Sequence, residues 1–156
     1  MTDYKAAFEQ GQEAARQADR ARKEIDTVLQ EFATALADAG QGKLKLTLRT
    51  YEVSDSKWFL AITFPPTPKE MYTAITAVNP TVKSPIVQLA KWKPGPTGYP
   101  CMIAWTGQER FCEDKEALQR CLAELVADPM IGEKLLSLVS LEEEPEQKEE
   151  AQQSPP

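Results

Sequence analysis

Apolar and polar residues alternate in the segment 43–53, where leucines at every second position are separated by lysine, threonine and arginine. A period of two predicts a β-strand with one buried face and one wet face. Turn residues follow at 54–56, and a second alternation runs from 57 to 65. Together the two segments predict an antiparallel hairpin over 43–65. We expect its alternating apolar residues in the core: Leu44, Leu46, Leu48, Leu60, Ile62 and Phe64.

A heptad pattern over residues 3–38 predicts one long helix that ends at Gly40. The seam residues are small in the first half of this segment and large in the second half. We therefore expect the second half to pack on the sheet, and the first half to project, fray or meet a partner helix. The positions predicted to face a partner are Phe8, Ala15, Ala18 and Ile25. The alternative is that the whole helix lies on its own domain.

A capping signal precedes residue 71. Thr67, Pro68 and Glu70 have the spacing of a capping box with proline in the first helical position, which predicts a helix over 68–78. Its β-branched residues argue against a helix, but the capping signal decides the prediction.

The remainder of the chain reads as strands followed by helices. Three further strands are predicted over 85–93, 99–106 and 109–113. Two short helices begin after Asp114 and Asp128, each of which is a suitable N-cap, and Leu122 is expected in the core between them and the sheet.

The sequence leaves the turn near residue 107 undecided. If Thr106 and Gly107 form a two-residue loop, Cys101 lies opposite Cys112, whereas a three-residue loop places Met102 there. Because a shift of one residue exchanges the faces of a strand, both registers stay open.

These elements predict an α+β fold. A long N-terminal helix precedes an antiparallel sheet of about five strands (the hairpin 43–65, then 85–113), with helices packed on one face and two short C-terminal helices. Residues 1–140 are expected to form a single domain, with the helix 3–38 partly projecting from it. Residues 141–156 are rich in glutamate and poor in apolar residues, and we expect a disordered acidic tail.

Residue usage gives little support for catalysis. The chain has no histidine, which removes the most common general base and metal ligand at neutral pH. Its three cysteines form no C-x-x-C motif, and Cys112, next to a predicted helix N-terminus, is flanked by acidic residues that oppose a thiolate. We therefore predict a protein that is not an enzyme and has neither a metal nor a cofactor. The N-terminus lacks a signal-peptide pattern and no membrane-spanning stretch is present, so we expect a cytoplasmic protein that does not enter membranes.

Basic residues gather in the middle of an otherwise acidic chain. Residues 41–112 contain nine Lys or Arg and four Asp or Glu, although the net charge of the chain is −6. Several of these cations lie beside aromatic residues, which is typical of surfaces that bind single-stranded nucleic acid. The predicted binding face comprises Lys45, Arg49, Tyr51, Lys91, Trp92 and Lys93. The alternative is that the tryptophan is a core residue and the lysines protect a sheet edge from aggregation.

The function expected from these features is macromolecular binding. The first expectation is a protein-interaction module (adaptor, inhibitor or chaperone-like) that binds a protein partner, with homodimerisation through its long helix as one form. The second is single-stranded nucleic-acid binding by the basic, aromatic sheet face, with the acidic tail as an autoinhibitor. The sequence does not identify the partner.

Overall fold

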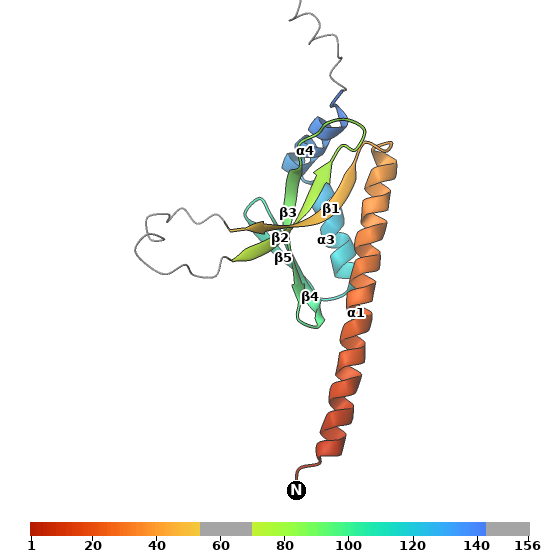
Figure 1. Ribbon diagram of the computed structural model, residues 1–156, viewed down its shortest axis with the longest axis vertical. Coiled ribbons are helices and arrows are strands. Elements are labelled where there is room, and N and C mark those ends of the chain that lie inside the picture. The colour runs from red at the N-terminus through yellow and green to blue at the C-terminus, as the bar shows by residue number, and fades with distance from the viewer. Residues whose placement is uncertain (54–69, 143–156) are drawn as a thin grey trace, which may run out of the picture.

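The computed structural model describes residues 1–53 and 70–142, which form an α+β fold (Figure 1). Five antiparallel strands lie in the order β1-β2-β3-β4-β5, so each strand pairs with its neighbour in the chain. The predicted fold class is confirmed. The elements are α1 (Tyr4–Ala39), β1 (Lys45–Glu52), β2 (Met71–Val78), β3 (Val87–Gly95), β4 (Gly98–Trp105), β5 (Gln108–Cys112), α3 (Lys115–Ala127) and α4 (Pro129–Val139).

Helix α1 lies within one residue of the predicted range 3–38 at each end, and Gly40 is its C-cap as predicted. The side chain of Asp3 accepts a hydrogen bond from the backbone N–H of Ala6 at 3.1 Å and so caps the N-terminus. At the C-terminus, the N–H of Gly40 donates to the carbonyl of Leu36 at 2.9 Å. The chain then turns with Gly42 at φ +78°, a conformation that glycine adopts without steric cost.

The second half of α1 packs on the sheet and meets the turn between β3 and β4. Gly98 has φ +96°, and a Cβ atom at this position would lie 2.8 Å from the Cβ of Ala21. The guanidinium of Arg22 donates to the carbonyl of Pro96 at 2.6 Å, and the hydroxyl of Tyr99 donates to Glu24 at 2.9 Å. This turn therefore marks the point where the helix leaves the domain, and the part of α1 before it projects, as Figure 1 shows.

The predicted helix over 68–78 is wrong, because residues 71–78 form strand β2. This strand pairs with β1 along its whole length, from Lys45 opposite Val78 to Glu52 opposite Met71. Residues 74–77 are all buried, so both faces of the strand are covered and no alternation appears in the sequence. The pairing of β2 with β1 and β3, which suits its β-branched residues, therefore outweighs the local capping signal.

Part of the predicted hairpin lies outside the described residues. Its first strand is β1. Leu44, just before β1, is buried and Leu46 packs on the core, but Leu48 is 48% exposed and is not a core residue. The predicted strand 57–65, with Leu60, Ile62 and Phe64, is not described, and neither are residues 143–156 of the predicted tail.

The turn between β4 and β5 resolves the register that the sequence left open. Thr106 and Gly107 form a two-residue loop with φ values of +47° and +75°, which is the geometry of a tight hairpin turn. Cys101 therefore lies opposite Cys112, and the alternative with Met102 in that place is excluded.

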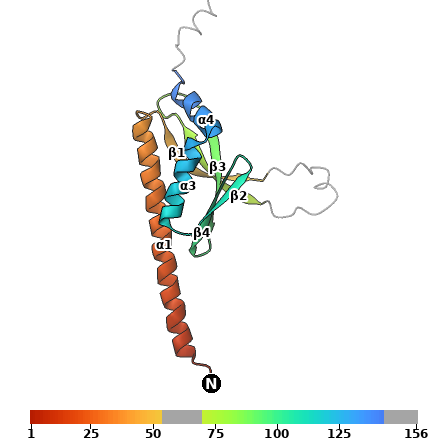
Figure 2. The same ribbon diagram turned by 180° about the vertical axis from the view of Figure 1, so that it is seen from behind.

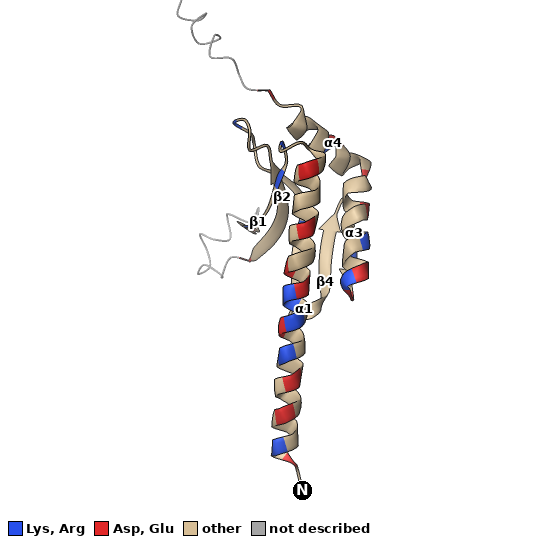
Figure 3. Ribbon diagram, turned by 90° about the vertical axis from the view of Figure 1, so that its right-hand side faces the viewer, with Lys and Arg blue, Asp and Glu red and all other residues tan. Residues whose placement is uncertain are grey.

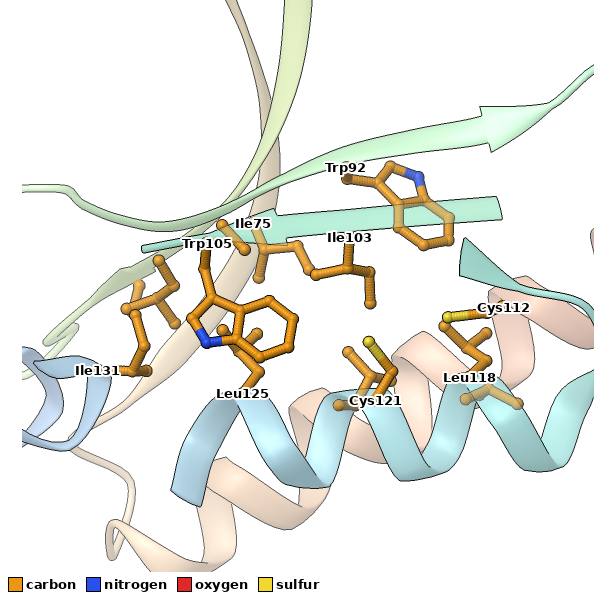
Figure 4. Packing of buried hydrophobic residues seen from close by; sticks show 14 of the residues in the cluster. Ile75, Trp92, Ile103, Trp105, Cys112, Leu118, Cys121, Leu125 and Ile131 are labelled. Atoms are coloured by element: carbon orange, nitrogen blue, oxygen red, sulfur yellow. The ribbon is translucent and has the colours of Figure 1, made fainter. Parts of the chain in front are cut away.

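The core lies between one face of the sheet and the helices. In Figure 4 the side chains of Trp92, Ile103 and Trp105 from the sheet point toward Leu118 and Leu125 of α3. Figures 1 and 2, which view the molecule from opposite sides, both place α3 and α4 on the same side of the sheet. One face of the sheet is thus covered by helices.

The two C-terminal helices begin at the predicted caps. The carboxylate of Asp114 accepts from the N–H of Ala117 at 2.7 Å, and that of Asp128 accepts from the N–H of Met130 at 2.9 Å. The other carboxylate oxygen of Asp128 accepts from the indole N–H of Trp105 at 3.3 Å, which ties α4 to the sheet. Leu122 is buried between helix and sheet, as predicted.

The close approach of α1 to the β3–β4 turn gives a stability prediction. Gly98→Ala should lower the free energy of unfolding by about 2–5 kcal/mol, because it adds overpacking against Ala21 to the cost of a left-handed backbone. Gly107→Ala is the matched control, since Gly107 also has positive φ but no atom lies within 4 Å of its Cβ position. Gly107→Ala should lower the free energy of unfolding by about 1–2 kcal/mol. Urea denaturation measures both, and equal losses would contradict tight packing at Gly98.

Candidate functional site

The face of the sheet opposite the core helices carries most of the predicted binding residues. On β1, Lys45, Arg49 and Tyr51 alternate with Leu46 and Leu48 and so point away from the core. Arg49 lies opposite Ala74 of β2, and Ala74 lies opposite Lys91 of β3. Cross-strand neighbours share a face, so Arg49 and Lys91 flank β2 on the same side of the sheet.

We name this surface the cationic sheet face. Its four cations come from two strands separated by β2, which contributes the small residue Ala74 between Arg49 and Lys91. All four cationic side chains are exposed, and among the described residues no carboxylate lies within ion-pair distance of any of them. The face consists of Lys45, Arg49, Tyr51, Tyr72, Lys91 and Lys93.

Two tyrosines lie at one end of this face. Tyr51 and Tyr72 are cross-strand partners whose rings stack with centroids 5.7 Å apart and planes 27° apart. The ammonium of Lys91 lies 5.0 Å from the centroid of Tyr72, within the range of a cation–π interaction. The hydroxyl of Tyr72 donates to Gln88 at 3.2 Å. Sequence reasoning missed Tyr72 because it assigned residues 68–78 to a helix.

Trp92 is a core residue and not part of this face. Its side chain is 6% exposed and belongs to the core cluster. Its neighbours in β3, Lys91 and Lys93, point the opposite way, as a strand with period two requires. The tryptophan that looked like a partner of the two lysines in the sequence therefore lies on the other side of the sheet from them, and Figure 4 shows its ring on the side of α3.

The projecting half of α1, residues 4–17, is the second candidate surface. Every residue in it is exposed, including Tyr4 at 79% and Phe8 at 64%. Of the four predicted partner-helix positions, Phe8 and Ala15 lie here. Ala18 and Ile25 are 7% and 4% exposed and pack within their own domain, so they are not available to a partner.

Charged residues of both signs are distributed along α1, as Figure 3 shows. Several pair within the helix: Arg16 with Glu13 at 3.0 Å, and Lys23 with Asp19 at 3.1 Å. These pairs are exposed to solvent and add little stability. The projecting half of α1 therefore has no strong charge of one sign that would select an oppositely charged partner.

The three cysteines cluster beneath the sheet. The thiol of Cys101 donates to the carbonyl of Cys112 at 3.8 Å, and Cys121 approaches from α3. The hydrogen bond with Cys112, followed by burial, raises the pKa of the Cys101 thiol, and the same two causes raise the pKa of Cys121. Side-chain hydrogen bonds with the thiols of Cys101 and Cys121 lower the pKa of the Cys112 thiol. Because all three are buried, none presents a nucleophile to solvent.

Two cavities border the strands of the sheet. A cleft of about 540 Å³ lies where β3 and β4 diverge, and Lys91, Glu109 and Lys134 are among its lining residues. A groove of about 390 Å³ lies between α1 and β1, with Leu29, Phe32 and Leu48 in its apolar lining. The groove accounts for the exposure of Leu48.

Over residues 1–53 and 70–142, no three His, Cys, Asp or Glu side chains are placed to hold a metal ion.

No family model, no curated protein and no solved structure matches this chain. Within the described part of the chain, none of the helices has an apolar stretch long enough to cross a membrane.

The different environments of Trp92 and Lys93 give a second prediction. Trp92→Ala should lower the free energy of unfolding by about 3–5 kcal/mol, because it leaves a cavity in the core. Lys93→Ala, on the exposed face of the same strand, should change it by no more than about 0.5 kcal/mol. Thermal and urea denaturation measure both variants. Similar small losses for the two would show that the tryptophan ring is not packed in the core.

Proposed function

We propose that this protein is a non-enzymatic interaction module, of the adaptor, inhibitor or chaperone-like kind, that self-associates through the projecting half of α1. The observation that carries the proposal is that residues 4–17 form helix yet are exposed throughout. At 1.5 Å per residue, these 14 residues extend about 21 Å beyond the domain.

Residues 4–17 continue the 36-residue helix α1 but stay exposed on every side. Most helical stability in proteins comes from packing an apolar stripe. The projecting half of α1 has such a stripe in Tyr4 and Phe8, but its own domain does not cover them. A second helix packed along this stripe would supply the missing contacts.

The stripe alternates between large and small residues. Tyr4, Phe8, Gly11 and Ala15 follow one another at intervals of four, three and four residues, which places them on one seam of the helix. No atom lies within 4 Å of the Cβ position of Gly11, so this small residue has no packing role inside its own chain. A small residue on an exposed seam allows another side chain to approach the helix closely.

An antiparallel pairing of two copies matches these sizes. Antiparallel helices that share the heptad seam can place Tyr4 opposite Ala15 of the second copy and Phe8 opposite its Gly11. Each layer then combines one aromatic residue with one small residue. A parallel pairing would place each glycine opposite glycine and leave a void, which packed interiors avoid.

The domain itself limits the overlap to this register. A pairing longer by one heptad would require Ala18 and Arg22 to face the second helix, but Ala18 is buried in its own domain and Arg22 binds the carbonyl of Pro96. A pairing shorter by one heptad would place Tyr4 opposite Phe8 and leave Gly11 unpaired. The intermediate register uses the whole free length of the helix.

The resulting interface is small. Four aromatic side chains at about 150–250 Å² each would bury on the order of 600–1,000 Å², which is the range of weak, transient complexes. We therefore expect a reversible monomer–dimer equilibrium that depends on protein concentration.

The size-matched layers can be tested by exchanging two residues. Phe8→Gly and Gly11→Phe should each weaken the dimer, because one leaves a void and the other creates a clash. The double variant restores one large and one small residue in each layer and should recover association. Sedimentation velocity over a concentration series measures the equilibrium. Failure of the double variant to recover would contradict the antiparallel register.

Charge variants separate assembly from folding. Phe8→Asp should give a monomer with unchanged stability, whereas Gln10→Asp, away from the seam, should leave the dimer intact. Ile25→Asp should lower the free energy of unfolding by more than about 4 kcal/mol, because it buries an unpaired charge. A wild-type chain that stays monomeric at all concentrations would refute self-association.

A further inference from the structure

The cationic sheet face combines positive charge and aromatic surface on rigid strands. Lys45 and Arg49 come from β1, and Lys91 and Lys93 come from β3, so β2 lies between two short rows of cations. Tyr51 and Tyr72 close one end of the rows. We infer that this face binds single-stranded nucleic acid, with the cations on the phosphates and a base stacked on the ring of Tyr51.

The charge of the face is concentrated although the chain as a whole is acidic. The net charge is −6, yet the four cations of this face have no carboxylate within ion-pair distance among residues 1–53 and 70–142. Unpaired cations on one surface attract a polyanion, and each phosphate contact releases counterions from the nucleic acid. The face is therefore complementary to a phosphate backbone.

The small residues of β2 keep the centre of the face low. Ala74 and Thr76 of β2 lie between these rows and are fully buried. Thr76 donates to the backbone carbonyl of Thr47 at 2.9 Å, which joins β2 to β1. Cations on long side chains thus stand on both sides of β2, and their exposed ends are the groups that phosphates can contact.

The tyrosine pair distinguishes a single strand from other polyanions. The ring of Tyr72 stacks on the ring of Tyr51 and is also contacted by the ammonium of Lys91. Tyr51 lies in β1, the edge strand of the described sheet, so its ring is the one placed to accept a further stacking partner. A single strand offers unstacked bases for such contacts, whereas a duplex or an acidic peptide offers charge without them.

This inference does not rest on the proposed helix dimer. The projecting half of α1 and the cationic sheet face share no residue. Phe8→Asp, which should remove the dimer, is therefore expected to leave the intrinsic affinity of the face for nucleic acid unchanged. The two proposals can fail separately.

The experiment is a fluorescence-anisotropy titration of the full-length chain with labelled oligo-dT and oligo-U, at low and at physiological salt. Saturable binding is expected for both single strands. The variant Arg49→Gln/Lys91→Gln should weaken it at least about tenfold and reduce the slope of log K against log salt by about 1.4, since about 0.7 is lost per phosphate contact. The control Lys115→Gln/Arg120→Gln removes the same charge on α3, outside the face, and should retain the affinity.

Stacking is tested at Tyr51. Tyr51→Ala should weaken binding about 5- to 100-fold, and Tyr51→Phe should restore it, because a phenyl ring stacks as a phenol does. Urea denaturation confirms that each variant is folded. Should Arg49→Gln/Lys91→Gln prove unstable, Lys45→Gln/Lys93→Gln provides the same loss of charge on the same face.

Three results would overturn the inference. One is the absence of saturable binding to either single strand at low salt. Another is equal affinity of the Arg49→Gln/Lys91→Gln variant and its charge-matched control. The third is binding of duplex DNA or polyglutamate as tightly as the single strands, which would show a general polyanion surface without base recognition.

Discussion

The architecture depends on the burial of one face of a five-stranded sheet beneath helices. Trp92, Ile103 and Trp105 point to this side and meet α3, α4 and the second half of α1. Hydrophobic burial is the largest favourable contribution to folding, so this contact fixes which side of each strand is inside. The side chains between them in sequence are consequently directed to the opposite face, and the cationic sheet face follows from this asymmetry.

Helix α1 shows how one heptad pattern can serve two purposes. Its seam is continuous from Tyr4 to Leu36, yet the domain covers it only from Ala18 onward. The β3–β4 turn sets the limit, because Gly98 allows the strand connection to approach Ala21 closely. The residues before this contact keep the spacing of a packing helix, and their alternation of large and small side chains is the feature that a second helix could use.

The cationic sheet face is assembled from segments that are distant in sequence. Arg49 and Lys91 are 42 positions apart and are brought to the same side of the sheet by their common neighbour Ala74. Tyr72 joins them through its stacking on Tyr51 and its contact with Lys91. Fixed strands hold these groups at defined spacings, which a flexible loop would not.

The sequence by itself determined the elements whose signals are local: the extent of α1, strand β1, the caps at Asp114 and Asp128, and hence the α+β class. It did not determine β2, because a strand buried on both faces has no alternation and the preceding capping signal pointed to a helix. The sequence also grouped Trp92 with Lys91 and Lys93, although neighbours in a strand face opposite sides. Only the tertiary structure decided these points and the register at Gly107, because each depends on which strand lies alongside, and pairing is a property of distant segments.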